Sequence, residues 1–155
     1  EAFCRWAGAR LPTELEWEWA AGGPAPAESA TTPWGGGLPD WRRCACEALR
    51  ADPDRPNGPG GTAPVGAHPT GASPFGVEDM LGNVWEWTAS IFSPYPVFVP
   101  WPYPGYSQAY FDGCHRVLRG GSWATRRWAM RTSFRNWYLP GIRQILAGFR
   151  CARDG

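Results

Sequence analysis

The sequence has 155 residues, of which 20 are Gly, 17 are Pro and 11 are Trp. So many Gly and Pro exclude a helical bundle, a coiled coil and a long regular sheet, because both residues are unfavourable inside regular elements. A hydrophobic content of 43% with 15% aromatic residues excludes a disordered chain. The composition therefore predicts one loop-rich domain over residues 1–155, with a core built from indole rings.

The net charge of +1 hides an asymmetry along the chain. Residues 1–112 carry 6 Arg and 13 Asp or Glu, a balance of −7, whereas residues 113–155 carry 9 Arg and only Asp154, a balance of +8. Either the two parts pack together and neutralise each other, or the basic part binds an anionic ligand. Nucleic acid is disfavoured because no more than two basic residues are adjacent, and no apolar run approaches the roughly 18 residues of a membrane span.

The cysteines form no zinc-binding pattern, since Cys44-x-Cys46 lacks a second pair and the spacings of Cys4, Cys114 and Cys151 are irregular. We interpret all five as structural or free thiols, which suit a cytoplasmic, reducing compartment. The chain starts with Glu1-Ala2-Phe3-Cys4-Arg5-Trp6, a pattern typical of the middle of a helix rather than of a signal peptide. We therefore expect the domain to be truncated at its N-terminus.

Two helices are expected near the start. Apolar residues at helical spacing over 2–7 end at Gly8. The next segment, 13–22, begins with Thr13 and Glu16 at the spacing of a capping box, in which each side chain satisfies a backbone N–H of the other. Residues 24–76 are expected to be mostly loop, anchored at four apolar positions: Trp34, Trp41, Val65 and Phe75.

The remaining regular structure is expected to be strands. Residues 84–88 alternate and predict a strand with one indole face, and 116–123 predict a strand, a glycine bend and a second strand. Residues 90–113 form an irregular excursion rich in Pro, Tyr and Phe, and 145–152 predict a closing strand. The fold class is therefore α+β, with one or two helices packed on a small bent antiparallel sheet.

Four segments occur in the order typical of one family: Arg10-Leu-Pro-Thr-Glu-Leu-Glu-Trp-Glu, Gly82-Asn-Val-Trp-Glu-Trp, Arg119-Gly-Gly-Ser-Trp and Gly148-Phe-Arg. Over its whole length the chain resembles the formylglycine-generating enzyme/sulfatase-modifying-factor domain, which implies a loop-rich, C-type-lectin-like fold. Formylglycine generation uses copper on two Cys after the Gly-Gly-Ser segment, since soft thiolates suit Cu(I). The corresponding positions here are Thr125 and Met130, so that activity is not expected.

Further segments, Tyr103–Phe111, Phe134-Arg-Asn-Trp137 and Arg143-Gln-Ile145, resemble the C-terminal domain of the iron(II)-dependent sulfoxide synthases of ergothioneine biosynthesis. The resemblance implies an enzyme that uses O2 to join a cysteine sulfur to C2 of trimethylhistidine, at iron bound by three His. This chain contains only His68 and His115, which we interpret as solvated loop residues. The iron ligands are therefore expected on a four-helix domain upstream of Glu1, and the chain alone is expected to be inactive.

The same resemblance implies the site residues. Asn136 and Trp137 match residues that contact trimethylhistidine, whose quaternary ammonium is best held by aromatic faces. Tyr138 stands where the best-known pattern has Asp, and Ile142 where it has the first of two Arg, so glutamylcysteine is in doubt as the donor. Free cysteine, another thiol and a selenium donor stay open, with Arg143 as the candidate partner of a carboxylate.

A tyrosine near the iron is thought to deliver a proton in these enzymes, a role that a phenol with pKa about 10 fills only when positioned. Tyr95, Tyr103 and Tyr106 lie in the matching excursion, and Tyr103 is the predicted catalytic residue.

In formylglycine-generating relatives a structural Ca2+ is bound by backbone carbonyls and one Glu. The matching positions here are Leu81, Gly82, Val84 and Glu86. The alternatives for Glu86 are this calcium site, a pair with an Arg, or a cap on nearby backbone amides.

Two other functions remain open. The fold also serves as a non-catalytic ligand-binding module in retroelement-diversified proteins, which would need no iron domain and would vary its surface around residues 124–144. The other is a selenium-transferring relative of the synthase. For the leading hypothesis the partners are small-molecule substrates (trimethylhistidine, a thiol donor and O2) and the upstream four-helix domain, with no nucleic acid and no membrane.

Overall fold

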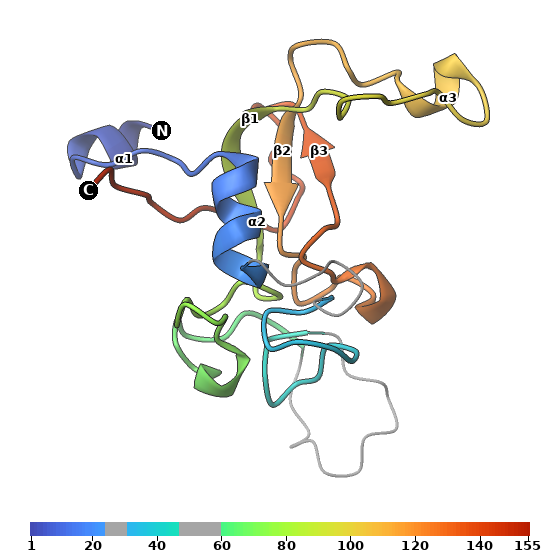
Figure 1. Ribbon diagram of the computed structural model, residues 1–155. Helices are drawn as coiled ribbons and strands as arrows, with labels where there is room; N and C mark the ends of the chain where they lie inside the picture. The colour runs from blue at the N-terminus through green and yellow to red at the C-terminus, as the bar shows by residue number, and fades with distance from the viewer. Residues whose placement is uncertain (24–30, 47–59) are drawn as a thin grey trace.

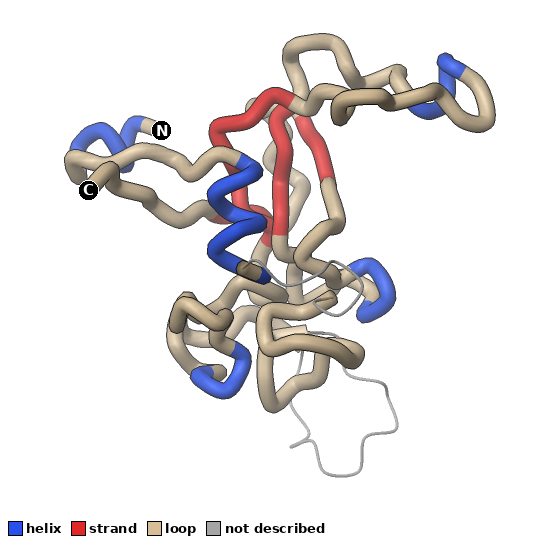
Figure 2. Tube along the Cα trace, viewed as in Figure 1, coloured by secondary structure: helices blue, strands red, loops and turns tan. Residues whose placement is uncertain are grey.

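The computed structural model describes residues 1–23, 31–46 and 60–155. Its helices are α1 (Ala2–Trp6), α2 (Glu14–Gly22) and α3 (Pro104–Ser107), with short 3-10 turns η1 (Pro69–Gly71) and η2 (Arg127–Ala129). Its strands are β1 (Trp85–Ile91), β2 (Arg116–Arg119), β3 (Asn136–Tyr138) and β4 (Ala147–Gly148), and loops make up most of the rest (Figure 1, Figure 2). The architecture is α+β, as the sequence predicts. No helix in these three ranges is long and apolar enough to cross a membrane.

One four-stranded sheet, in the order β3-β2-β1-β4, forms the centre of the fold. β1 pairs antiparallel with β2 and β2 pairs antiparallel with β3, but β4 pairs parallel with β1. The expectation of a purely antiparallel sheet was therefore wrong at this edge. The chain leaves β3 at one edge and crosses to the other edge before β4, which brings β4 alongside β1 in the same direction.

Helix α2 forms where the capping box predicts it. The Thr13 hydroxyl accepts a hydrogen bond from the Glu16 amide at 3.2 Å, and the Glu16 carboxylate accepts one from the Thr13 amide at 2.7 Å. The helix lies against β1 and β2 (Figure 1) and buries Trp17 and Ala21 together with Met80. Local capping therefore fixes the start of the element that covers the sheet.

The face of β1 that packs on α2 is not the one that carries its Trp side chains. Glu86 and Thr88 are buried, and the Trp17 indole N–H donates to Glu86 at 2.6 Å. Trp85 and Trp87 alternate with these residues and lie half-buried on the opposite face. The indole face therefore exists, but it is not the face that packs on α2.

Strand β2 ends in the predicted glycine bend, where Gly120 and Gly121 have φ of +92° and +77°. No strand follows directly at Ser122 and Trp123, contrary to the prediction. Instead the Ser122 amide donates to the Thr125 hydroxyl at 2.9 Å in a turn, and the chain returns to the sheet only at β3.

The described loops are held by a second core cluster of Cys44, Cys46, Leu81 and Met130, with Trp34 packed against it. Trp34 is therefore an anchor, as expected, and half-exposed Phe75 stacks on Trp19. Val65 is 90% exposed, so its prediction as an anchor was wrong. The remaining parts of the expected 24–76 loop, 24–30 and 47–59, lie outside the described residues.

The five cysteines are free thiols. Cys44 and Cys46 are buried, and their mutual hydrogen bond, together with burial, raises the pKa of the Cys44 thiol. This thiol therefore stays protonated and unreactive. Cys4 and Cys151 join the two ends of the chain, with their sulfur atoms 3.3 Å apart.

The acidic and basic parts of the chain neutralise each other, which is one of the two alternatives that the charge asymmetry left open. Arg135 binds Glu14 and Arg150 binds Glu86, each with a closest N–O distance of 2.6 Å. Arg119, fully buried on β2, pairs with Glu18. Acidic residues of the first part of the chain therefore pair with arginines of the last part.

Gly82 tests how closely two loops approach. Its φ is +82°, and a Cβ there would lie 2.3 Å from the Ala45 carbonyl oxygen. Gly113 has a similar φ of +76° but open space around it. We expect Gly113→Ala to cost about 1 kcal/mol for the left-handed backbone alone, and Gly82→Ala to cost about 1–3 kcal/mol more for the clash. Chemical denaturation measures the difference, and equal costs would contradict the close approach.

Glu16 provides a pH test of the α2 cap. Its hydrogen bonds from Arg10 and Thr13 lower its pKa from 4.5 to about 2. Ionised Glu16 therefore stabilises the fold above about pH 4.5, and this contribution is lost as the pH falls through about 2. We expect Arg10→Met to raise the Glu16 pKa toward 4.5 in an NMR titration. The pKa of Asp112, about 2 because of the Cys114 amide and His115, is the control and should not move.

Candidate functional site

Three of the four predicted substrate-binding residues form strand β3. Asn136, Trp137 and Tyr138 are paired with Leu118, Val117 and Arg116 of β2, in that order. Each is half-buried at the edge of the sheet. Arg143 follows in the loop after β3 and is exposed. The structure therefore brings Asn136, Trp137 and Tyr138 onto one strand, with Arg143 five residues further along the chain.

The Trp137 indole is the centre of an aromatic cluster. It stacks on Phe92 with ring centroids 4.4 Å apart and an interplanar angle of 8°, and Tyr110 lies tilted against it at 5.6 Å. Phe111 packs on Phe92 at 4.8 Å. We call Phe92, Tyr110, Phe111 and Trp137 the Trp137 cluster. Phe92, Tyr110 and Phe111 all come from residues 92–113, the part of the aromatic-rich segment that follows β1. This segment therefore supports the indole.

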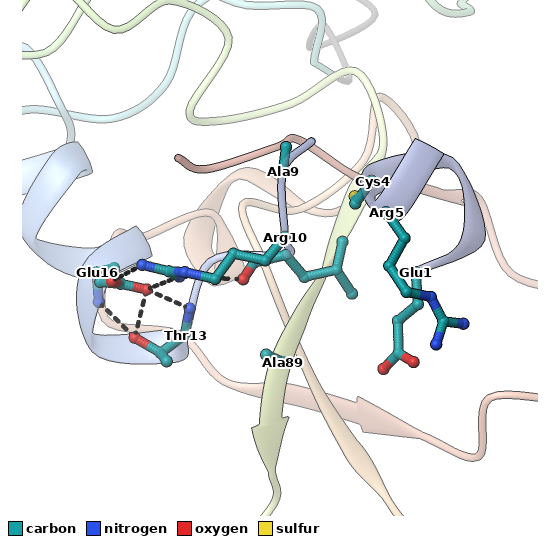
Figure 3. Close-up of a pocket in the computed structure, with 9 residues that line it drawn as sticks. Glu1, Cys4, Arg5, Ala9, Arg10, Thr13, Glu16 and Ala89 are labelled. Carbon is teal, nitrogen blue, oxygen red and sulfur yellow. Dashed lines mark hydrogen bonds and ion pairs between the residues drawn. The ribbon is translucent and has the colours of Figure 1, made fainter. Parts of the chain in front are cut away.

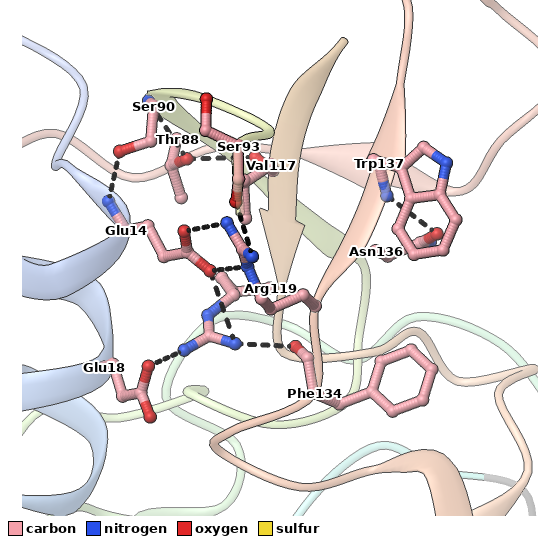
Figure 4. Close-up of polar contacts among 11 residues, drawn as sticks. Glu14, Glu18, Thr88, Ser90, Ser93, Val117, Arg119, Phe134, Asn136 and Trp137 are labelled. Carbon is pink, nitrogen blue, oxygen red and sulfur yellow. Dashed lines mark hydrogen bonds and ion pairs between the residues drawn. The ribbon is translucent and has the colours of Figure 1, made fainter. Parts of the chain in front are cut away.

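Behind this cluster, buried ionic contacts connect the sheet to α2. Glu14 is 5% exposed and accepts two hydrogen bonds from Arg135, at 2.6 and 2.8 Å. The Arg119 guanidinium lies 3.8 Å from Glu14, binds Glu18, and donates to the Phe134 carbonyl at 2.9 Å (Figure 4). These contacts hold the residues just before Asn136 and Trp137.

The Asn136 side chain is folded back onto the strand. Its Oδ1 accepts a hydrogen bond from the Trp137 amide at 3.0 Å (Figure 4). This bond orients the side-chain amide beside the indole. An amide held in this way offers a fixed set of polar atoms to a ligand that lies against Trp137.

The predicted catalytic Tyr103 lies elsewhere in the described structure. It precedes α3 at the outer end of the 92–113 excursion, away from the sheet (Figure 1), and its ring contacts Tyr106 at 5.9 Å. Its role stays a prediction. Two other tyrosines lie nearer: Tyr110 contacts Trp137, and Tyr95 lies 4.3 Å from the Arg135 guanidinium. Burial and the Glu14 charge raise the Tyr95 pKa.

The two histidines do not form a metal site. His115 is held by Asp112, with its Nδ1 2.8 Å from the carboxylate, while His68 precedes η1. In the described part of the chain no three His, Cys, Asp or Glu side chains gather as a metal site would need. Two histidines are too few for a three-His iron site, and the resemblance's placement of the ligands upstream of Glu1 stays a prediction.

The positions that hold copper in formylglycine-generating relatives carry no thiolate here. Thr125 is used in the turn with Ser122, and Met130 is buried in the core cluster with Cys44 and Cys46. The expectation that the chain does not generate formylglycine rests on these residue types and stays a prediction.

Two cavities open near the start of the chain. One, of about 390 Å³, is lined by residues of α1 and the α2 cap, including Cys4, Arg10 and Glu16 (Figure 3). The other, of about 370 Å³, is lined by seven residues, among them Trp87, Arg116 and Pro140. Neither is lined by Asn136, Trp137, Tyr138 or Arg143.

At the predicted calcium positions, the Glu86 carboxylate has protein partners. It accepts hydrogen bonds from Arg150 at 2.6 and 2.7 Å and from the Trp17 indole at 2.6 Å. Leu81 is buried in the core and the Gly82 amide donates to the Gly120 carbonyl. The pair with an Arg, one of the alternatives for Glu86, is therefore formed, and an ion would have to compete with Arg150 for the same oxygens.

Chelation distinguishes the calcium site from the Arg pair at Glu86. Because Arg150 already supplies the positive charge, we expect EDTA to leave the melting temperature unchanged and Arg150→Met to lower the stability by about 3 kcal/mol, the cost of leaving a buried carboxylate unpaired. Differential scanning calorimetry gives both values. A fall in melting temperature with EDTA that added Ca2+ reverses would instead establish calcium at Leu81, Gly82, Val84 and Glu86.

Comparisons with known proteins give the family. The model of the sulfatase-modifying factor enzyme 1-like domain matches residues 1–155. The chain is 51% identical to a hercynine oxygenase of Mycolicibacterium thermoresistibile and 50% identical to one of Mycobacterium tuberculosis, in both cases over 99% of this chain and 34% of the relative. It is also 38% identical to a formylglycine-generating enzyme of Streptomyces coelicolor, over 99% of this chain and 49% of that enzyme.

Solved structures agree on the fold. PvdO from Pseudomonas aeruginosa superposes with a TM-score of 0.63 at 23% identity, over 96% of this chain and 56% of PvdO. Treponema denticola variable protein 1 superposes with a TM-score of 0.59 at 28% identity, over 91% of this chain and 46% of that protein. The chain spans about a third of the length of the hercynine oxygenases it matches. The chain belongs to the family of the sulfatase-modifying factor enzyme 1-like domain.

Proposed function

We propose that this chain is the substrate-binding domain of a hercynine oxygenase that acts in ergothioneine biosynthesis. In the parent protein the reaction joins the sulfur of a cysteine-type thiol to C2 of trimethylhistidine, which is hercynine, with O2 as the oxidant. The iron(II) that supplies the oxygen chemistry is held by a domain upstream of Glu1. The compartment is the cytoplasm, where thiol donors are kept reduced.

One observation supports this function most directly. The half-buried Trp137 indole lies at the sheet edge with Asn136 beside it, and its ring is fixed by stacking on Phe92. A trimethylammonium group cannot donate a hydrogen bond and is attracted to an aromatic face, most strongly to that of Trp. A rigid indole next to an oriented amide suits hercynine, and the likeness to hercynine oxygenases extends over 99% of this chain.

The carboxylate of a substrate needs a cation that the fold has not already used. Arg119 and Arg135 are bound to glutamates of α2. Arg143 is exposed, and no carboxylate in the described residues pairs with it. We propose that Arg143 binds a carboxylate of hercynine or of the thiol donor, while Tyr138 lies at the donor side and Tyr103 is the proton donor.

The full-length parent protein provides the test. We expect Trp137→Ala to raise the Kd for hercynine at least about tenfold, because the cation–π attraction is lost, while the protein still folds. Trp128→Ala is the matched control, since this indole is 67% exposed on η2. Isothermal titration measures both. Unchanged hercynine binding by folded Trp137→Ala would overturn the assignment.

The alternative of a non-catalytic binding module makes a different prediction for the parent. A module needs no iron. The oxygenase needs three His ligands, which this chain's His68 and His115 cannot supply alone and which the family resemblance places upstream of Glu1. Sequencing the reading frame upstream of Glu1 and measuring iron in the purified parent distinguish the two functions. If the parent protein contains no iron, or lacks three His upstream of Glu1, the oxygenase is excluded and the non-catalytic binding module remains.

A further inference from the structure

Arg135, the residue before Asn136, contacts Phe92 of the Trp137 cluster. The Arg135 guanidinium is 4.7 Å from the centre of the Phe92 ring and 4.3 Å from that of Tyr95. The Trp137 indole lies 4.4 Å from the same Phe92 ring and is almost parallel to it. An indole stacked this closely leaves no room for a guanidinium on that face of Phe92. Arg135 therefore lies on the opposite face.

The Arg135 guanidinium is itself fixed by three hydrogen bonds to two residues. Its Nε and Nη2 donate to the two oxygens of Glu14, at 2.6 and 2.8 Å, and its Nη1 donates to the Ser93 carbonyl at 2.9 Å. Only 14% of the Arg135 side chain is exposed, and 7% of the Glu14 side chain. A bidentate pair of this kind restricts both the position and the plane of the guanidinium.

Glu14 is fixed in turn by secondary structure. It is the first residue of α2, directly after the Thr13 cap, and its amide donates to the Ser90 hydroxyl at 2.9 Å. Its negative charge is also favoured at the helix N-terminus. A continuous stack therefore runs from a capped helix to the proposed substrate surface, in the order Glu14, Arg135, Phe92 and Trp137.

We propose that Arg135 is a positioning residue for hercynine: through Phe92 it sets the plane of the Trp137 indole that receives the trimethylammonium group. This inference rests on the proposed function and adds to it a residue that does not touch the substrate. Arg135 holds the outer face of Phe92 by a cation–π contact, so the Phe92 ring cannot tilt away from Trp137. Because Phe92 covers one face of the Trp137 indole and Tyr110 also lies against the ring, hercynine binds at the part of the indole that these two residues leave uncovered.

Lysine and methionine at position 135 separate positioning from charge. Lys keeps the positive charge but cannot make the bidentate pair or stack its plane on Phe92. We expect Arg135→Lys in the full-length parent to raise the KM for hercynine about fivefold with kcat within about twofold of wild type, because a displaced aromatic wall weakens ground-state and transition-state binding alike. The KM for the thiol donor should stay unchanged.

The double variant Glu14→Gln/Arg135→Met addresses the remaining structural explanation. Arg135→Met alone leaves the Glu14 carboxylate buried without its bidentate partner, which destabilises the fold. Removing both charges should restore most of the melting temperature, yet the hercynine KM should stay raised. If the double variant recovers the wild-type KM, Arg135 acts only as a counter-ion for Glu14 and the proposal is overturned.

Arg10→Met is the matched control. Arg10 also pairs with a glutamate in the first turn of α2, Glu16, at 2.6 Å. None of its contacts involves an aromatic ring of the Trp137 cluster. Its loss should leave the hercynine KM at the wild-type value. An equal rise in KM for Arg10→Met and Arg135→Lys would show a general effect of α2 and overturn the proposal.

A double-mutant cycle of unfolding free energies tests the contact from Arg135 through Phe92 to Trp137 without any substrate. In this chain, unfolding free energies of Arg135→Lys, Trp137→Leu and the double variant should be non-additive, whereas Arg10→Met and Trp137→Leu should be additive. Additivity of the first pair refutes the stack. If the stack is coupled but hercynine binds neither wild type nor variants, the proposed function fails while the contact from Arg135 to Trp137 stands.

Discussion

The buried carboxylate of Glu14 is the constraint on which the rest of the structure depends. A carboxylate that is 5% exposed is tolerated only with charged and hydrogen-bonding partners. Those partners lie more than a hundred residues away in the sequence: Arg119 on β2, and Arg135 directly before β3. The position of α2 on the sheet therefore depends on β2 and on the segment before β3. Breaking a buried pair of this kind typically costs about 3–5 kcal/mol.

This requirement explains how so short a strand can carry a site. β3 has three residues and one ladder, to β2, which is too little to fix its position by backbone pairing alone. Arg135 stands directly before it and is held by Glu14 and by the Ser93 carbonyl. The contacts of Arg135, the residue before the strand, thus fix the start of β3 and with it the positions of Asn136 and Trp137.

How much of this could be predicted from the sequence follows from the range of each interaction. The α2 cap, the glycine bend at Gly120 and the fold class rest on neighbours within a few residues, and the sequence predicts them correctly. β3 has no alternation long enough to indicate a strand, and the parallel pairing of β4 depends on how the chain crosses the sheet. The charge asymmetry left open whether the acids and arginines pair with each other, and it could not indicate which residues would do so.

The same limits apply to the candidate site. Asn136 and Trp137 could be chosen because the motif Phe134-Arg-Asn-Trp137 includes the first two residues of β3, and their role in binding stays a prediction. Tyr110 could not, since its contact with Trp137 depends on how the 92–113 excursion folds back onto the sheet. The signal available was only that this excursion is rich in aromatic residues. Arg135 was hidden for another reason: its partner Glu14 lies in a motif that is fully explained by helix capping.

The ionic contacts also restrict what the site can recognise. Arginines 119, 135 and 150 are committed to glutamates and cannot read a substrate carboxylate without breaking the fold. At the end of β3 where the thiol donor is proposed to bind, Tyr138 offers a phenol and Arg143 an exposed guanidinium. Arg116, which pairs with Tyr138 across the sheet and has no carboxylate partner in the described residues, is a second cation beside the same strand. The demands of the fold on arginine thus leave Arg116 and Arg143 among the cations near β3 that can bind a substrate carboxylate, and the identity of the thiol donor stays open.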